Sequence, residues 1–342
     1  MRTLVTGGCG FIGSNLIREL LSLEDIVSVV NLDALTYSGN PKNLIDVNDI
    51  RYSFIHGSIN DKDLLSEILK DSKIEVVLHL AAESHVDRSI HSCSPFIKTN
   101  IDGTRVVLES ILERRNSGQK VSLVHVSTDE VYGSLSPEEP EFTEDSQIRP
   151  RNPYAVTKAS SDLLVQAFVN TYELEAVITR CSNNYGPFQF PEKLIPLITI
   201  NSLEDRKLPV YGDGKQIRDW IHVKDHCRGI IDAAKGLKSG KVDSGDVINF
   251  GASNEKTNIE IVNTILSILD KPINLIQYVK DRPGHDRRYA MGYEKAKSLL
   301  GWEPEIDWEG GIKETVRWYV DNSVWVSEIK SGEYLNWIEK HY

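Results

Sequence analysis

Two sets of side chains in this chain could perform acid–base chemistry on an alcohol. Thr128, Asp129 and Glu130 follow an apolar run, and Tyr154 and Lys158 come about one structural element later. A tyrosine assisted by a lysine can remove a hydroxyl proton during oxidation, and two carboxyl groups can supply an acid and a second base. A chain that carries both sets can oxidise a substrate and also eliminate water from it.

Tyr154 and Lys158 are four residues apart, which places both side chains on the same face of a helix. A free tyrosine has a pKa of about 10, so a phenolate base that works near neutrality requires a lower pKa. The Lys158 cation and a positively charged nicotinamide would both favour the phenolate. We therefore expect a lowered pKa for Tyr154.

Asp129 and Glu130 come directly after the expected strand Ser122–Ser127. Open α/β folds bind ligands at the carboxyl ends of such strands. Residues in an extended chain alternate between faces, so both acids can serve one substrate only if the chain turns there. Two carboxyl groups in one small site repel each other, which raises one pKa and leaves the other group ionised. One group would then be the acid and the other the base for eliminating water beside a ketone.

The elements that must position these residues alternate between strands and helices. The expected strands are Thr3–Thr6, Val27–Leu32, Tyr52–His56, Glu75–Leu80, Ser122–Ser127 and Ala176–Thr179. The expected helices are Ile12–Leu21, Lys62–Leu69 with Asp61 as N-cap, Pro95–Arg115 and Tyr154–Tyr172. This order predicts an α/β fold with a doubly wound parallel sheet. After Cys181 the elements shorten, so we expect a nucleotide-binding domain over 1–181 and a smaller lobe over 182–342, interleaved with it by segments that return to the sheet.

A glycine loop lies between the first expected strand and helix. Gly8, Gly10 and Gly13 satisfy the G-x-G-x-x-G pattern, and Gly7, Gly10 and Gly13 also recur every three residues. Such a loop lets backbone amides approach a pyrophosphate at a helix N-terminus. Asp33 ends the second strand 20 residues after Gly13, where a carboxylate accepts hydrogen bonds from a ribose and repels a 2′-phosphate. The cofactor is therefore expected to be NAD rather than NADP.

The composition excludes several other classes of protein. The 342-residue chain has a net charge of −11, which disfavours nucleic acid as a partner. Its four cysteines form no C-x-x-C pair, so neither a metal site nor a disulfide framework is expected. Apolar strand residues begin at Thr3, and no apolar run reaches the roughly 18 residues that a membrane span needs. We expect a cytoplasmic protein without a signal peptide.

The glycine loop, the tyrosine–lysine pair and the alternating elements resemble the extended short-chain dehydrogenase/reductase family. Within it, the chain resembles most closely the branch of nucleotide-sugar 4,6-dehydratases that act on dTDP-glucose. The similar blocks run through nearly the whole chain: Thr6–Asn15, Asn31–Asn40, Leu80–Ile90, Val126–Gly133, Asn183–Leu197, Tyr211–Val223 and Asp281–Ala290. Ser58, where the family usually has aspartate, and Cys9, where alanine is usual, depart from the pattern.

The resemblance implies a hydro-lyase that recycles NAD and makes a 4-keto-6-deoxy sugar for deoxysugar pathways such as dTDP-rhamnose biosynthesis. The implied catalytic residues are Thr128, Asp129, Glu130, Tyr154 and Lys158. The implied cofactor residues are Gly7, Gly10, Phe11, Ile12, Gly13, Asp33, Leu35, Thr36, Ser58, Ile59, Leu80, Ala81, Ala82, Ser84, Thr99, Tyr154, Lys158 and Asn184. The implied substrate residues are Ser84, Thr128, Asn183, Lys193, Leu194, Pro209, Val210, Tyr211, Arg218, Asn254, Asp281, Arg282, Pro283, Gly284 and His285, with Arg218 and Arg282 neutralising the diphosphate.

The resemblance also implies a homodimer formed through the helices that begin at Pro95 and Tyr154. Three alternatives remain open at this point. The chain could dehydrate another nucleotide sugar, or it could be a nucleotide-sugar 4-epimerase, which needs no acid to expel a hydroxyl. It could also be a non-catalytic NAD-sensing regulator on the same fold.

Overall fold

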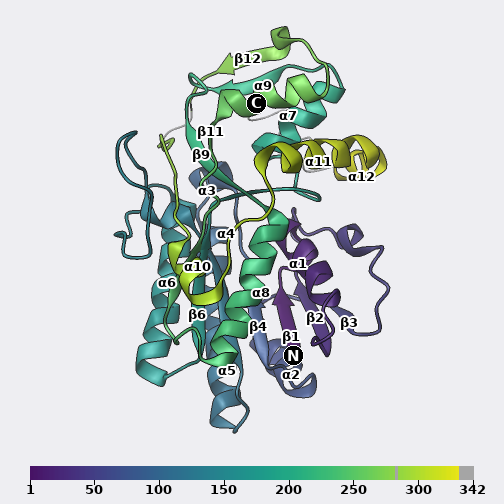
Figure 1. The fold of residues 1–342 in the computed structure, drawn as a ribbon. Coiled ribbons are helices and arrows are strands. Elements are labelled where there is room, and N and C mark those ends of the chain that lie inside the picture. The colour runs from purple at the N-terminus through teal and green to yellow at the C-terminus, as the bar shows by residue number, and fades with distance from the viewer. Residues whose placement is uncertain (282–283, 331–342) are drawn as a thin grey trace.

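The computed structural model describes residues 1–281 and 284–330. Its centre is a seven-stranded sheet in the order β10-β6-β5-β4-β1-β2-β3, in which all neighbouring strands pair in parallel (Figure 1). The strands are β1 (Arg2–Thr6), β2 (Ser28–Asp33), β3 (Tyr52–His56), β4 (Val76–His79), β5 (Ser122–Thr128), β6 (Ala176–Cys181) and β10 (Val247–Phe250). The predicted α/β class and parallel sheet are confirmed.

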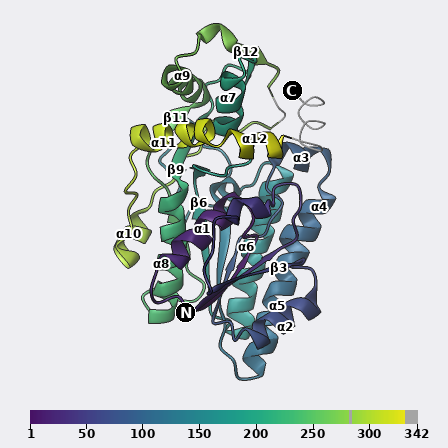
Figure 2. The ribbon, with the colours of Figure 1, turned by 90° about the vertical axis from the view of Figure 1, so that its right-hand side faces the viewer.

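Helices cover both faces of this sheet (Figure 2). On one face lie α1 (Phe11–Leu21) and α8 (Val223–Ser239), with α10 (Glu294–Leu300) beside α8. On the other lie α2 (Lys62–Asp71), α5 (Thr104–Asn116) and α6 (Pro153–Tyr172). The central strands β1, β4, β5 and β6 are almost wholly buried, as expected for a parallel sheet that is covered on both faces.

The predicted helix Pro95–Arg115 differs from the structure in its interior. After α3 (Val86–His91), the chain forms α4 (Ser94–Phe96), a π-helical segment (Ile97–Gly103) and then α5. Gly103 lies where an added Cβ would be 2.4 Å from Ile59 Cδ1. The wider helical turn and the missing side chain let this segment pass close to the residues after β3. π-helical turns of this kind occur frequently at functional sites.

The C-terminal lobe packs above the carboxyl ends of the strands in Figure 1. It contains a three-stranded sheet of β7 (Asn183–Tyr185), β9 (Ile217–His222) and β11 (Glu255–Thr257), and a pair formed by β8 (Leu208–Tyr211) and β12 (Ile276–Val279). Its helices are α7 (Leu194–Leu203), α9 (Asn258–Ile268), α11 (Trp308–Asp321) and α12 (Ser323–Ile329). Its core includes Tyr185, Ile195, Val210 and Trp220.

The chain crosses between the two parts more than once. β7, α7 and β8 belong to the lobe, yet α8 and β10 follow them and return to the large sheet. The strand order reverses between β1 and β4, and such a switch point creates a crevice at the carboxyl edge of a sheet. None of the helices within 1–281 and 284–330 is long and apolar enough to cross a membrane.

Candidate active site

The glycine loop forms one wall of a cavity of about 350 Å³ at the switch point. Gly7 has φ +74°, and a Cβ there would be 2.8 Å from the backbone of Ala81. A Cβ on Gly13 would be 2.2 Å from the Gly7 carbonyl oxygen. The N-cap of α1, Gly10, provides no side-chain cap, so the first-turn amides of this helix are available to an anion in the cavity. The cradle has the shape and polarity that a pyrophosphate requires.

Asp33 fixes the glycine loop to the end of β2. Its Oδ2 accepts a hydrogen bond from the Cys9 amide at 2.9 Å, and its Oδ1 accepts one from the Leu35 amide at 2.8 Å. Burial raises the pKa of Asp33, and these two backbone hydrogen bonds oppose the rise. The carboxyl group therefore lines the cavity in a fixed orientation, where its remaining lone pairs can meet a ribose.

The structure brings nearly all of the expected cofactor residues to this cavity. Leu35 is the exception, because its neighbour Ala34 lines the wall instead. The lining residues that the sequence predicted are Gly7, Gly10, Phe11, Ile12, Gly13, Asp33, Thr36, Ser58, Ile59, Leu80, Ala81, Ala82, Ser84, Thr99, Tyr154, Lys158 and Asn184.

Tyr154 and Lys158 project from the first two turns of α6 into the same cavity. The Asn152 side chain caps this helix by accepting a hydrogen bond from the Ala155 amide at 2.8 Å. Lys158 Nζ donates to the Val126 carbonyl at 2.8 Å. Burial lowers the pKa of Lys158 to about 8, and the Asp162 carboxylate opposes this change.

The lowered Tyr154 pKa expected with Lys158 and a cationic nicotinamide stays a prediction, because in the protein alone the shift has the opposite direction. Burial raises this pKa well above its ordinary value, and the nearby Glu130 and Asp129 carboxyls raise it further. Hydrogen bonding with Thr128 acts in the opposite direction. The sequence reasoning counted the cation of Lys158 and omitted desolvation and the two acids.

The two acids lie on a turn. β5 ends at Thr128, and Asp129–Tyr132 form a short 3-10 helix, so Asp129 and Glu130 both line the cavity. The Thr128 hydroxyl donates to Asp129 Oδ1 at 3.2 Å, and Asn152 Nδ2 donates to Glu130 Oε2 at 3.1 Å. The turn thus satisfies the geometric condition that an extended chain would fail.

Asp129 is the more deeply buried of the pair. Its exposed fraction is 2%, and its Oδ2 has no hydrogen-bond partner among residues 1–281 and 284–330. Burial raises the pKa of Asp129 well above the ordinary value, Glu130 and Asp219 raise it further, and Arg218 opposes them. These shifts favour the protonated form of the carboxyl group, which is the form that a general acid requires.

The expected substrate residues divide into two groups. Ser84, Thr128, Asn183 and Lys193 line the cavity, and Lys193 Nζ donates to the Ser84 carbonyl at 3.2 Å. The lobe residues outside this lining are Leu194, Pro209, Val210, Tyr211, Arg218, Asn254, Asp281, Gly284 and His285. Arg282 and Pro283 lie outside the described residues.

Several of these lobe residues still gather near one another. His285 Nδ1 and Asp281 Oδ1 are 2.6 Å apart, and the rings of His285 and Tyr211 are 6.0 Å apart. Arg218 lies over the ring of Tyr289 with its guanidinium carbon 4.4 Å from the ring centroid. Val210 is an exception because its side chain is buried in the lobe core.

Sequence reasoning assigned no role to Glu192, another carboxyl group that lines the cavity. Its exposed fraction is 4%, and its Oε2 is 3.4 Å from Arg88 Nε and 3.6 Å from His85 Nε2. Burial raises the pKa of Glu192 to about 7, and the nearby Lys193 and Arg88 oppose the rise. The only sequence signal was its position next to Lys193, which does not reveal that the side chain turns inward.

Comparisons with known proteins agree along the whole chain. A family profile described as GDP-mannose 4,6 dehydratase matches residues 4–315. The chain is 48% identical to dTDP-glucose 4,6-dehydratase 1 of Escherichia coli K12, over 100% of this chain and 99% of that protein. The crystal structure of the dTDP-glucose 4,6-dehydratase DesIV from Streptomyces venezuelae, with NAD and TYD bound, superposes with a TM-score of 0.91 at 44% identity, over 96% of this chain and 100% of the other. A dTDP-glucose 4,6-dehydratase from Bacillus anthracis in complex with NAD has a TM-score of 0.87 at 45% identity, over 96% and 100% of the two chains.

Proposed function

We infer the reaction from the family, because this chain belongs to the dTDP-glucose 4,6-dehydratases. It is an NAD-dependent hydro-lyase that converts dTDP-glucose into dTDP-4-keto-6-deoxyglucose and water. The observation that carries this proposal is the buried Asp129, whose pKa is raised by burial, beside Glu130 and Tyr154 in one cavity. An oxidoreductase alone needs the tyrosine, whereas expelling a hydroxyl group needs the additional acid.

The cavity fits NAD at its glycine-loop end. The close approach of Gly7 and Gly13 to neighbouring backbone leaves room for a pyrophosphate but none for a side chain. Asp33 would hold the adenine ribose, and Lys158 would hold the nicotinamide ribose. When bound, NAD supplies an acceptor for the hydride of sugar C4 and later donates a hydride to C6.

Tyr154 is the base for the sugar 4-hydroxyl. Its phenolic oxygen takes the hydroxyl proton, and Thr128 and Lys158 orient and stabilise the oxygen that forms. The raised pKa of Tyr154 in the protein alone means that the phenolate requires added positive charge. A cationic nicotinamide beside the ring would supply that charge, together with Lys158.

Glu130 and Asp129 perform the elimination. The ketone at C4 acidifies the proton on C5, and a Glu130 carboxylate oxygen takes this proton. Asp129 donates its proton to the departing 6-hydroxyl, which leaves as water. Asn152 donates a hydrogen bond to Glu130, and Thr128 donates one to Asp129. Each carboxyl group is therefore held in its own orientation.

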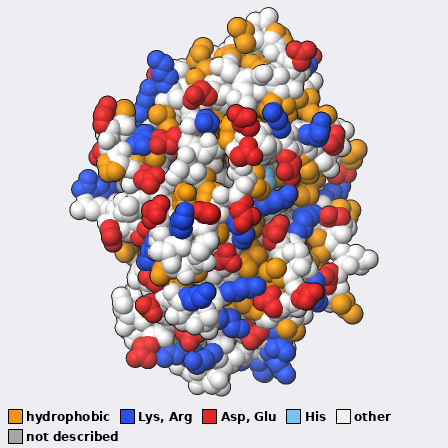
Figure 3. Space-filling model, viewed as in Figure 1, with side chains coloured by type: hydrophobic (Ala, Val, Ile, Leu, Met, Phe, Trp, Pro, Cys, Tyr) orange, Lys and Arg blue, Asp and Glu red, His pale blue; other side chains and the backbone are white. Residues whose placement is uncertain are grey.

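Asn183, Lys193 and Ser84 would hold the sugar diphosphate at the lobe end of the cavity. Arg218 and the loop from Asp281 to His285 would bind the nucleotide. The face in Figure 3 shows Lys and Arg side chains interspersed with Asp and Glu. In such a chain, with net charge −11, the diphosphate is attracted by these local cations rather than by the overall field.

One experiment tests the reaction and the nucleobase together. The purified protein is incubated with dTDP-glucose and, separately, with UDP-glucose, without added NAD, and the products are analysed by mass spectrometry. We expect loss of one water from the thymidine sugar only, because bound NAD is regenerated in each turnover. Loss of water from both sugars would remove the nucleobase specificity, and an unchanged mass together with an inverted C4 in the proton NMR spectrum would identify an epimerase.

Asp129→Asn is the matched variant for this experiment. It keeps the size of the side chain and removes the proton that the leaving hydroxyl needs. We expect reduced nicotinamide to accumulate in a single turnover while water loss slows by about 10²-fold or more. Normal water loss by this variant would reject the role assigned to Asp129.

We also propose a homodimer through α6 and the π-helical segment. Val156 and Leu163 on α6 and Ile97 on the π-helical segment expose 46%, 58% and 44% of their surfaces. The spacing of Val156 and Leu163 places them on one helix face. Light scattering should give twice the 38.5 kDa chain mass, and Leu163→Glu should give the monomer. A monomeric wild-type protein would overturn this proposal.

The cellular setting is also a proposal. A 4-keto-6-deoxy sugar is a precursor for deoxysugars such as dTDP-rhamnose, and we propose that this reaction takes place in the cytoplasm. Cell fractionation with an antibody against the chain tests the location. Sugar analysis of a strain that lacks the gene tests the pathway, and an unchanged rhamnose content would contradict it.

A further inference from the structure

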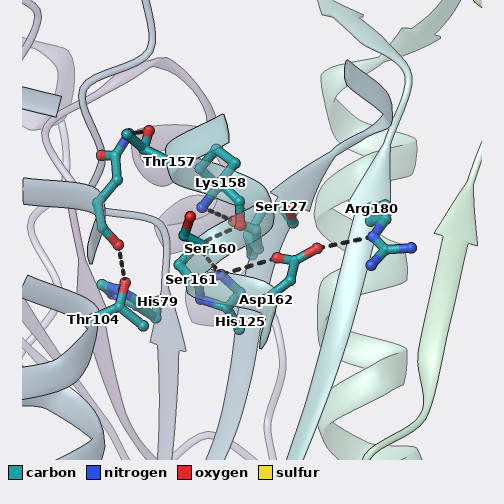
Figure 4. A network of polar contacts seen from close by, with 12 residues as sticks. His79, Thr104, His125, Ser127, Thr157, Lys158, Ser160, Ser161, Asp162 and Arg180 are labelled. Atoms are coloured by element: carbon teal, nitrogen blue, oxygen red, sulfur yellow. Dashed lines mark hydrogen bonds and ion pairs between the residues drawn. The ribbon is translucent and has the colours of Figure 1, made fainter. Parts of the chain in front are cut away.

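A buried polar network lies beneath Lys158, between α6 and the strands β5 and β6 (Figure 4). Asp162, one helical turn after Lys158, points toward the sheet and lies between His125 and Arg180. Its Oδ2 accepts a hydrogen bond from Arg180 Nε at 2.9 Å, and its Oδ1 is 3.4 Å from His125 Nε2. Lys158, Asp162 and Arg180 are each less than 5% exposed, and His125 is fully buried.

The titratable groups that interact with Lys158 come from four elements: Asp162 of α6, Cys181 of β6, His125 of β5 and His79 of β4. Tyr154 lies one turn before Lys158 on α6, and Arg180 of β6 contacts Asp162. Burial lowers the pKa of His125 to about 4 and that of His79 well below its ordinary value, so both rings are neutral at physiological pH. Burial raises the pKa of Cys181, which keeps the thiol protonated.

The charges that remain are two cations, Lys158 and Arg180, and one anion, Asp162. Burial opposes ionisation of Asp162, but its contacts with His125 and Arg180 outweigh burial and lower its pKa. A buried lysine loses its proton readily unless an anion is nearby. Arg180 cannot serve this purpose because its charge has the same sign as that of Lys158.

We propose that Asp162 is a positioning residue that keeps Lys158 protonated in the dry interior, and that Arg180 and His125 hold Asp162 in place for this purpose. Asp162 would contact neither sugar nor cofactor. It would act only through the charge of Lys158, on which the phenolate of Tyr154 and the ribose contact both depend.

Asp162→Asn tests this inference because it keeps the shape and removes the charge. In the protein without substrate, the ¹³Cε resonance of Lys158, identified by its loss in Lys158→Met, is titrated by NMR. We expect its midpoint to fall by about one pH unit or more. The alkaline limb of kcat for dTDP-glucose should move down by the same amount, which is about a fivefold loss at a pH where the wild type is half active.

Two variants separate this charge effect from general damage. Asp162→Glu keeps the charge and should restore most of the wild-type pH profile. Asp225→Asn removes another buried acid, which lies on α8 and outside the cavity lining. Asp225 accepts hydrogen bonds from the Arg228 side chain and from the backbone amides of Glu305 and Ile306. It should lower the melting temperature and leave both the profile and the Lys158 midpoint unchanged.

Wild-type titration behaviour in Asp162→Asn would overturn the inference. If that variant does not fold, Asp162→Ser gives a second test, because it removes the same charge with a smaller side chain; the Lys158 midpoint should again fall, and an unchanged or raised midpoint would reject the inference. The kinetic measurement rests on the proposed function, whereas the NMR titration does not. A wild-type protein inactive on dTDP-glucose would therefore remove the function and leave this test in force.

Discussion

The two ends of the active-site cavity are built in different ways. At the glycine-loop end, backbone amides and short-range turns form the binding surface, and a single hydrogen-bonded carboxyl group, Asp33, fixes the loop. Beyond the lobe end, outside the cavity lining, charged side chains from distant segments pair with one another: Arg287 with Asp213, and Arg288 with Glu255. The first arrangement depends on the absence of side chains, and the second depends on long-range pairing.

This difference determines where positive charge is available to a ligand. Arg287 and Arg288 are already engaged within the protein, since Arg287 pairs with Asp213 and Arg288 also donates to the carbonyls of Ser136 and Glu139. Arg218 donates to the Asp286 carbonyl at 2.9 Å. A diphosphate at this end therefore competes with existing partners, whereas a pyrophosphate at the glycine loop meets amides that no side chain caps.

The largest expected effect lies between the two ends, at the shared base. Tyr154→Phe removes the group that takes the 4-hydroxyl proton and should lower kcat by about 10³-fold, within the range of general-base catalysis. NAD content, measured by absorbance after protein precipitation, should stay near the wild-type level. A drop of less than about tenfold would mean that another group serves as the base.

Gly7→Ala should damage the glycine-loop end selectively. An added Cβ would be 2.8 Å from the Ala81 backbone at φ +74°, so we expect at least tenfold weaker NAD binding, about 1.4 kcal/mol, by calorimetry. Gly118→Ala is the matched control, because Gly118 has φ +85° and nothing within 4 Å of the added atom. Equal effects of the two substitutions on NAD binding would show that backbone strain, and not close approach, sets the affinity.

The stability of Asp129→Asn relative to wild type should increase as the pH rises. The folded protein holds the Asp129 proton more tightly than the unfolded chain does, because burial raises this pKa well above its ordinary value. The contribution of Asp129 to the folding stability of wild type is therefore fully present below the ordinary pKa of an aspartate, and it is lost as the pH rises through the raised pKa. We expect the variant to unfold at a higher urea concentration than wild type at pH 8, and to show a smaller gain at pH 4. A gain independent of pH would contradict the raised pKa.

The smallest effect should come from the exposed pair at the lobe end. Asp213 and Arg287 side chains are 50% and 46% exposed, so Asp213→Asn should cost less than about 0.5 kcal/mol after solvent screening. The sign is opposite to that of Asp129: hydrogen bonding with Arg287 lowers the pKa of Asp213, so this contribution exists at neutral pH and disappears on acidification. A large loss, or a tenfold rise in KM, would show that this pair organises the nucleotide site.

The local elements of the large sheet could be predicted from sequence. Strand Tyr52–His56 has the predicted bounds, and Asp61 caps α2 by accepting from the Leu64 amide at 3.1 Å. These features depend on alternation, glycine turns and capping, which are visible within a few residues. The π-helical segment Ile97–Gly103 was not predicted, because its altered hydrogen-bond register leaves no signal in the composition of the helix.

The site could be predicted only where the spacing of residues within a short motif fixes their relative positions. The glycine loop, Tyr154 and Lys158 do so, and they reach one cavity. The raised pKa of Tyr154 and the inward turn of Glu192 depend on burial by segments far away in the chain. Partners such as Glu255 for Arg288 are also invisible to a sequence in which charges appear without contacts.

The returning strand β10 has a consequence for how the chain is made. A ribosome must deliver Phe250 before the seven-stranded sheet can be completed, and by then β7, α7 and β8 of the lobe have already emerged. A nascent chain that stops near residue 181 would present β6 as an open edge and lack the cover of α8. We therefore expect the two parts to fold together, and a fragment that ends near residue 181 should be insoluble.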